Sequence, residues 1–298
     1  MRGGRRQDAD QPGWRAAFAP VDVSRRRFLG LVSGAVAVGL LEGRGRAAPA
    51  APGGLQEARD PSAPSAFEQL HLPIVTVPSF TRNGAHVPIV VEMAHPMDGD
   101  HAIKSVHILN DSDPIPSKGT FHFTPDNGHV YLATQARMHS GTSSVVVVAE
   151  CTRHGQWAHR QQITIPEGAE GCVSVADGKD QGDEDIRPPV IRIPALVARG
   201  SVRQGEVIQV QLQVKHPSRT GLALRDGQFV QVSEPFYLKQ MEVFYGERPV
   251  SRYEMTPALS DNPFLTFMLR TNAERYLRIA LTNSRGQRFE ATEELVFS

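Results

Sequence analysis

Short segments of alternating character constrain the fold of this chain more than any other feature. Residues 206–215 alternate polar and apolar positions, and residues 144–150 contain four consecutive valines. Similar segments recur from residue 67 to residue 298, separated by Gly, Pro and Asn, with no long helical period. A period of two indicates a strand with one buried face, and a valine run fits a strand buried on both faces. The sequence therefore predicts an all-β protein built from immunoglobulin-like sandwiches.

A glycine-rich acidic stretch divides this β pattern into two modules. Residues 167–186 contain few large apolar side chains, so they cannot bury enough surface to fold alone. We therefore predict two immunoglobulin-like β-sandwich domains, residues 67–166 and 187–298, joined by a flexible acidic linker. Residues 51–66 are rich in Ala and Pro and are predicted to be a disordered leader.

The first 50 residues have the features of an export signal. The sequence Ser-Arg-Arg-Arg-Phe-Leu-Gly at residues 24–30 is similar to the twin-arginine motif, and an apolar run follows at residues 31–41. The signature positions are Arg25, Arg26, Phe28 and Leu29. The apolar run is shorter than a bilayer requires, although an N-terminal membrane anchor is the alternative. We expect export to the periplasm by the twin-arginine route, with cleavage before Ala51.

The charge of the chain argues against nucleic acid as a partner. The formal net charge is zero, but residues 1–50 hold nine Arg and four acidic residues, which leaves a net charge of −5 on the remainder. Nucleic-acid binding requires a basic surface. The sequence also lacks a Gly-x-Ser-x-Gly elbow, a phosphate-binding loop and a dinucleotide fingerprint, which argues against a hydrolase.

The two cysteines are the candidate reactive groups. Cys172, preceded by Gly171, lies in the predicted linker, and Cys151 ends the valine strand. Cys172 could be a free nucleophile, although the neighbouring carboxylates would raise its pKa. It could instead form a disulfide with Cys151, closing a loop of about 20 residues and stabilising the fold by roughly 3 kcal/mol. A third alternative is a regulatory bridge, in which Cys151 resolves a group carried on Cys172.

The first module contains ten histidines, but their spacing does not indicate a metal site. No His-x-x-x-His or Cys-x-x-Cys motif is present, and a metal site needs three or four converging ligands. We therefore expect no metal and no cofactor. His101, His107 and His122 are predicted to be exposed polar positions on strands or their flanks.

Several short motifs, in order along the chain, resemble two known families. The first module resembles SoxY at Asn83-Gly84, Val87-Pro88, His95-Pro96-Met97, Lys104-Ser105, residues 120–125 and residues 147–150. The second module resembles SoxZ at His216-Pro217, Thr220-Gly221, Met241, Tyr245-Gly246, Pro257-Ala258 and Asn262-Pro263. SoxY and SoxZ are the two subunits of the thiosulfate-oxidation carrier, and here they appear fused.

The resemblance implies a sulfur carrier rather than a catalyst. Cys172 falls where SoxY has its carrier cysteine, so it would hold sulfur intermediates covalently and present them to partner enzymes. Fused carriers of this kind resemble those that accompany quinoprotein dehydrogenases. The alternative is a β-sandwich adaptor that docks to such a dehydrogenase, with Cys172 bonded to Cys151. In either case the two modules are expected to pack on each other.

Overall fold

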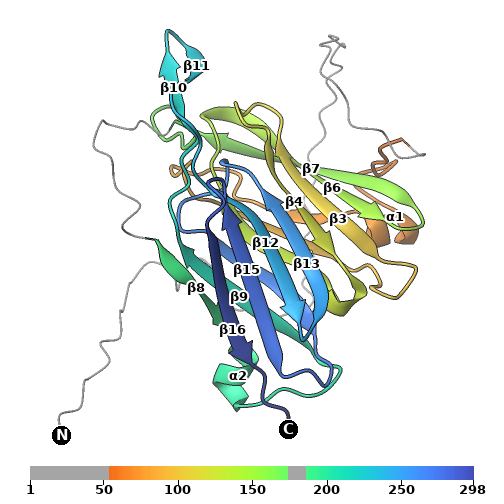
Figure 1. The fold of residues 1–298 in the computed structure, drawn as a ribbon. Coiled ribbons are helices and arrows are strands. Elements are labelled where there is room, and N and C mark those ends of the chain that lie inside the picture. The colour runs from red at the N-terminus through yellow and green to blue at the C-terminus, as the bar shows by residue number, and fades with distance from the viewer. Residues whose placement is uncertain (1–53, 174–185) are drawn as a thin grey trace, which may run out of the picture. The chain divides into compact units, whose positions relative to one another are not determined.

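The computed structural model describes residues 54–173 and 186–298. The predicted export signal and the central part of the acidic linker lie outside these residues. Within them, nearly all regular structure is β, with two short α-helices and one 3₁₀ turn. These are α1 (Ala66–His71), α2 (Pro194–Arg199) and η1 (Pro125–Asn127). The predicted all-β sandwich class is confirmed (Figure 1). No described helix is long and apolar enough to cross a membrane.

Two antiparallel sheets form the body of the described chain. The six-stranded sheet has the order β1 (Ile74–Thr76), β2 (Val87–Met93), β5 (Val130–Ala136), β14 (Phe264–Arg270), β9 (Val207–Lys215) and β8 (Arg187–Arg192). The eight-stranded sheet has the order β16 (Arg288–Glu294), β15 (Tyr276–Asn283), β12 (Leu238–Tyr245), β13 (Arg248–Met255), β4 (Ser117–Phe123), β3 (Ile103–Asn110), β6 (Gly141–Cys151) and β7 (Gly155–Ile165). A separate hairpin of β10 (Leu222–Arg225) and β11 (Gln228–Gln231) projects beyond both sheets (Figure 1).

Both sheets run without a break from the first module into the second. In the larger sheet, β4 pairs with β13 over five residue pairs, from Phe123 opposite Ser251 to Gly119 opposite Met255. In the smaller sheet, β5 pairs with β14. The two modules are therefore joined by backbone hydrogen bonds as well as by side-chain packing.

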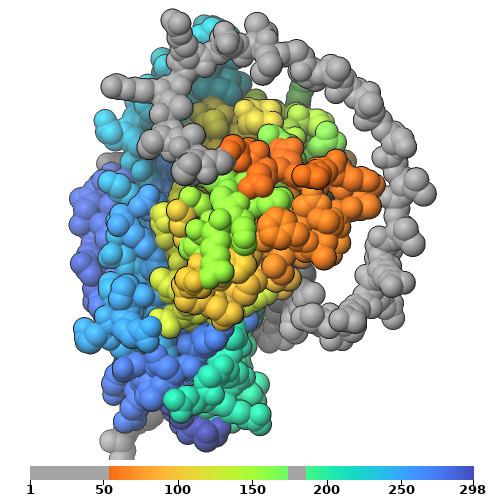
Figure 2. All heavy atoms as spheres, turned by 90° about the vertical axis from the view of Figure 1, so that its right-hand side faces the viewer, coloured from red at the N-terminus to blue at the C-terminus, as the bar shows by residue number. Residues whose placement is uncertain are grey.

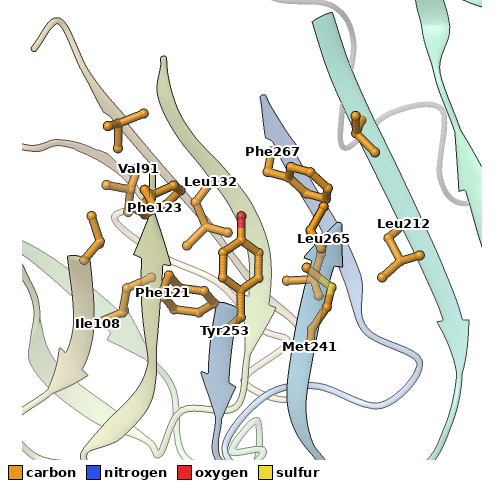
Figure 3. Packing of buried hydrophobic residues seen from close by; sticks show 14 of the residues in the cluster. Val91, Ile108, Phe121, Phe123, Leu132, Leu212, Met241, Tyr253, Leu265 and Phe267 are labelled. Carbon is orange, nitrogen blue, oxygen red and sulfur yellow. The ribbon is translucent and has the colours of Figure 1, made fainter. Parts of the chain in front are cut away.

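The hydrophobic core is also shared, and Tyr253 lies at the junction. Its ring is fully buried and makes edge-to-face contacts with one ring from each module. The distance between ring centroids is 5.2 Å to Phe121 of the first module and 6.0 Å to Phe267 of the second. Figure 3 shows this ring between residues of the two modules. Because one core serves both halves, we expect them to fold as one cooperative unit.

The segment before the first module is ordered from Gly54 onward, so the prediction of a disordered leader is wrong there. The backbone amide of Gln56 donates a hydrogen bond to the Gln156 carbonyl at 2.9 Å, and the Gln56 carbonyl accepts one from the Ala158 amide at 2.8 Å. These two bonds attach the segment to the edge strand β7. Figure 2 shows orange atoms from the N-terminal part of the described chain beside light-green atoms. The segment then enters α1 through a capping box between Ser65 and Glu68.

Candidate functional site

The predicted linker begins as an arm, residues 166–173, that is docked on the first module. Gly84 donates its backbone amide to Ala169 at 2.7 Å, and Gly171 donates to the Met138 carbonyl at 2.9 Å. Arg137 donates a guanidinium hydrogen bond to the Gly171 carbonyl at 3.0 Å. The prediction of a flexible linker is therefore wrong for this part of it.

Gly171 and Gly84 are needed for the close approach of the arm. A Cβ atom at Gly171 would lie 2.3 Å from the Gly84 carbonyl oxygen and 2.3 Å from the Cα of Ala85. A Cβ atom at Gly84 would lie 2.5 Å from the Ala169 carbonyl oxygen. These obstacles are backbone atoms, which cannot move aside independently. A side chain at either position would force the arm away from its docking surface.

The second module closes the site from the other side. Thr220 donates its hydroxyl hydrogen bond to the Cys172 carbonyl at 2.8 Å. Arg137 pairs with Asp261 at 2.6 Å, and Asp261 also accepts from the Ser218 amide at 2.5 Å. Cys172 therefore lies where the SoxY-like and SoxZ-like modules meet.

The Cys172 side chain is buried, with 1% of its surface exposed. Burial, and then the neighbouring Asp113 carboxylate, raise its pKa to about 12, although Lys118 and Arg137 act in the opposite direction. The docked thiol is therefore protonated and shielded at neutral pH. The expectation of a thiol presented on a mobile loop is wrong for this conformation, because the glycine contacts hold the arm down.

A fully buried ion pair forms the floor of this site. Lys118 contacts the Asp113 carboxylate and also donates to the Arg137 carbonyl at 2.9 Å and the Ile115 carbonyl at 3.1 Å. Asp113 accepts a further hydrogen bond from the His139 amide at 2.6 Å. Both charges are thus satisfied by fixed partners, which positions a cation and an anion beside the thiol.

The structure separates Cys172 from Cys151. Both cysteines are free thiols. Gly171 is bonded to Met138, just before the start of β6, whereas Cys151 is the last residue of β6. The eleven residues of β6 therefore place the cysteines roughly 30 Å apart, while a disulfide requires Cα atoms within about 7 Å. The alternative of a Cys151–Cys172 disulfide is wrong for this fold, and so is direct resolution of Cys172 by Cys151.

Cys151 lies instead in a cluster of histidines. One nitrogen from each of His71, His95 and His101 and the Cys151 sulfur all lie within 4.8 Å of one another. His71 ends α1, His95 follows β2, His101 precedes β3 and Cys151 ends β6. His154, in the turn after β6, places Nδ1 2.9 Å from Nε2 of His71 and 3.6 Å from the Cys151 sulfur.

The histidine cluster contradicts the prediction that these side chains would not converge. Separate elements supply the ligands, so no helical spacing could reveal them. His101 is only partly exposed, because it packs against the other rings. One local signal was present, since Cys151 and His154 lie three residues apart across a turn between two strands. Partly exposed His107 and His122 lie on β3 and β4, outside this cluster.

Comparison with known families matches both modules. The model described as "Sulfur oxidation protein SoxY" matches residues 68–172, and that described as "Sulphur oxidation protein SoxZ" matches residues 197–294. Together with the paired sandwiches, these matches define a protein of the sulfur-oxidation carrier family. The chain belongs to the SoxY and SoxZ families, with the two domains in tandem as in a fused SoxYZ-type protein.

Two other comparisons add little. No curated protein matches the chain. Among solved structures, a putative superoxide reductase from Thermotoga maritima is 22% identical, with 38% of this chain and 95% of that chain covered and a TM-score of 0.31. A β-glucuronidase from Parabacteroides merdae is 10% identical, with 74% of this chain and 24% of that chain covered and a TM-score of 0.23. At these scores neither similarity carries an argument about this chain.

Proposed function

We propose that this protein carries sulfur intermediates covalently on Cys172 and presents them to partner enzymes. The observation that carries the proposal is the position of Cys172, which is the last residue of the SoxY match and lies against the SoxZ-like module. The thiol is held on an arm fixed mainly by backbone hydrogen bonds. Such an arm can leave its site without unfolding either module.

In this proposal the docked arm is the protected state of the carrier. A protonated thiol with 1% exposure reacts slowly, because the thiolate is the nucleophile and the sulfur cannot be reached. A partner enzyme gains access by binding the released arm. Release exposes the thiol to water, removes the influence of Asp113 and lowers its pKa toward that of an ordinary cysteine.

The loading step must form a sulfur–sulfur bond. The Cys172 thiolate and thiosulfate together lose two electrons to a partner oxidant of the haem-enzyme class, and their sulfurs join as Cys–S–S–SO₃⁻. The thiol proton passes to solvent. The chain itself neither gains nor loses further electrons, so its role is to hold the product. Lys118 and Arg137, which line the docked site, would offset the sulfonate charge if the loaded arm returned.

We propose the periplasm as the site of action, reached by the twin-arginine route through Arg25, Arg26, Phe28 and Leu29. The support is the motif itself, since those residues lie outside the described structure. The proposed partners are sulfur-oxidising enzymes. The association with a quinoprotein dehydrogenase is a further proposal that rests on the resemblance alone, and co-purification from the native host tests it.

Tetrathionate tests the carrier chemistry without a partner enzyme. The thiolate attacks a central sulfur of tetrathionate, forms Cys–S–S–SO₃⁻ and releases thiosulfate, so the reaction balances without another oxidant. We expect slow, complete loading at Cys172 that reductant reverses, and no such loading in Cys172→Ala. Peptide mass mapping identifies the site. Failure of folded wild-type protein to load Cys172, or loading at Cys151 instead, would contradict the proposal.

A further inference from the structure

We propose that the histidine cluster binds a single divalent transition-metal ion. The ligands would be Nε2 of His71, His95 and His101, the sulfur of Cys151, and Nδ1 of His154. This inference is independent of the carrier chemistry at Cys172, which lies at the other end of β6.

Two histidines of the cluster, His71 and His95, present Nε2 atoms that are hydrogen-bond acceptors. Nδ1 of His71 lies 2.7 Å from the Phe67 carbonyl, and Nδ1 of His95 lies 2.6 Å from the Pro96 carbonyl. A carbonyl oxygen only accepts, so each Nδ1 carries the proton and each Nε2 presents a lone pair. The same arrangement orients imidazole ligands in metal sites, where the second nitrogen donates to a carbonyl or carboxylate.

Two imidazole nitrogens of the cluster have no hydrogen-bond partner within the described residues. Nε2 of His95 and Nε2 of His101 are buried and make no hydrogen bond. A buried polar atom without a partner costs free energy, and here two such atoms lie in the same cluster. A metal cation satisfies both and also accepts the Cys151 thiolate.

The surroundings of the cluster are suited to a rigid, shielded site. The Trp157 ring stacks on His71 at 5.2 Å, and the Phe67 ring contacts His154 edge-on at 5.2 Å. The ligands lie at the ends of α1, β2 and β6 and beside the start of β3, elements that the core holds in place. Aromatic packing around metal ligands limits solvent access and fixes ligand direction.

The donor set indicates which ions fit. Imidazole and thiolate suit iron, cobalt, nickel, copper and zinc rather than magnesium or calcium. His71 and His154 place their ligand nitrogens 2.9 Å apart. With metal–nitrogen bonds of ~2.1 Å, two ligand nitrogens lie ~3.0 Å apart when the angle at the metal is a right angle and ~3.4 Å apart when it is tetrahedral. The His71–His154 distance is near the first value. The number of donors, five rather than four, favours a five-coordinate ion over the four-coordinate zinc of structural sites.

Cobalt(II) provides a direct test on tag-free full-length protein that has been stripped with chelator. We expect one equivalent of Co²⁺ to bind and to produce a thiolate-to-cobalt charge-transfer band in the near ultraviolet. Cys151→Ser should lose the band, whereas Cys172→Ser, the matched thiol control, should keep it. His95→Ala should weaken binding at least about tenfold, and His122→Ala, a histidine outside the cluster, should leave it unchanged.

Thermal melting checks that each variant is folded and gives a second readout. Bound Co²⁺ should raise the Tm of the wild-type protein and of His122→Ala equally, and should raise that of His95→Ala by less at the same Co²⁺ concentration. No stoichiometric binding, or a band that survives in Cys151→Ser, would overturn the site. Unchanged affinity and an unchanged visible spectrum in His154→Ala would overturn the five-coordinate assignment. Metal analysis of protein purified from its native host then identifies the physiological ion.

Discussion

A single methyl group at residue 171 should release the Cys172 arm. In Gly171→Ala the new Cβ atom would lie 2.3 Å from the Gly84 carbonyl oxygen, well inside van der Waals contact. The obstacle is backbone, so the arm rather than a side chain must move. Undocking loses four hydrogen bonds, which join Gly84 to Ala169, Gly171 to Met138, Arg137 to Gly171 and Thr220 to Cys172.

The size of the effect follows from these contacts. Four hydrogen bonds at about 1 kcal/mol each contribute about 4 kcal/mol. With burial of the Cys172 side chain offsetting all but about 1 kcal/mol of the entropy of ordering the arm, the net docking free energy is about 3 kcal/mol. Roughly one wild-type molecule in a hundred would then have its arm released. If Gly171→Ala abolishes docking, alkylation of Cys172 should become about 100-fold faster.

The assay is timed alkylation with iodoacetamide at pH 8, followed by peptide mass mapping to separate Cys172 from Cys151. Gly54→Ala is the matched control, because no atom lies within 4 Å of a Cβ added at Gly54. We expect the control to react at the wild-type rate. A Gly171→Ala protein that is folded, as judged by a single cooperative melting transition, yet reacts at Cys172 within twofold of wild type would refute the docking argument.

Three further outcomes follow. Lys118→Met should lower the free energy of unfolding in urea by about 3–5 kcal/mol, because it leaves Asp113 buried and unpaired, and Lys118→Met with Asp113→Asn should recover part of the loss. The pKa of the Cys172 thiol is raised in the folded protein, so the stability that the protonated thiol contributes is present below pH 9 and is lost as the pH rises toward 12. Between pH 9 and pH 10, the free energy of unfolding of the wild-type protein should therefore fall by roughly 1 kcal/mol more than that of Cys172→Ala. Ser65→Ala removes the cap of α1 and should cost about 1 kcal/mol by urea unfolding, and a loss indistinguishable from zero would contradict the role of the cap.

The strands could be predicted because their alternation is a local property. The polar and apolar alternation of residues 206–215 became β9, and the valine run became the centre of β6. Helix α1 was missed because it has only six residues, too few for a hydrophobic period, and depends on the Ser65–Glu68 capping box. The β10–β11 hairpin was missed because its residues are largely exposed and carry no clear alternation.

The sites could be predicted only in part, because both depend on contacts between distant residues. The sequence identified Cys172 but not its burial, which results from the approach of Gly171 to Gly84 across 87 positions. Likewise, His71 and Cys151 are 80 positions apart and meet only when α1 packs beside the end of β6. The pairing of β4 with β13, which joins the two modules into one sheet, could not be predicted either. Each of these strands has a sequence that would also fit a separate domain.

The central claim is that Cys172 carries sulfur and Cys151 does not. It is tested most directly by mass mapping of the protein isolated without reductant from its native host, grown with and without thiosulfate. We predict adducts of sulfur or of a sulfonate-bearing sulfur at Cys172 that increase with thiosulfate and are removed by reductant, with Cys151 unmodified. An unmodified Cys172 under both conditions, or a mass loss of two hydrogens that links the two cysteines, would contradict the account.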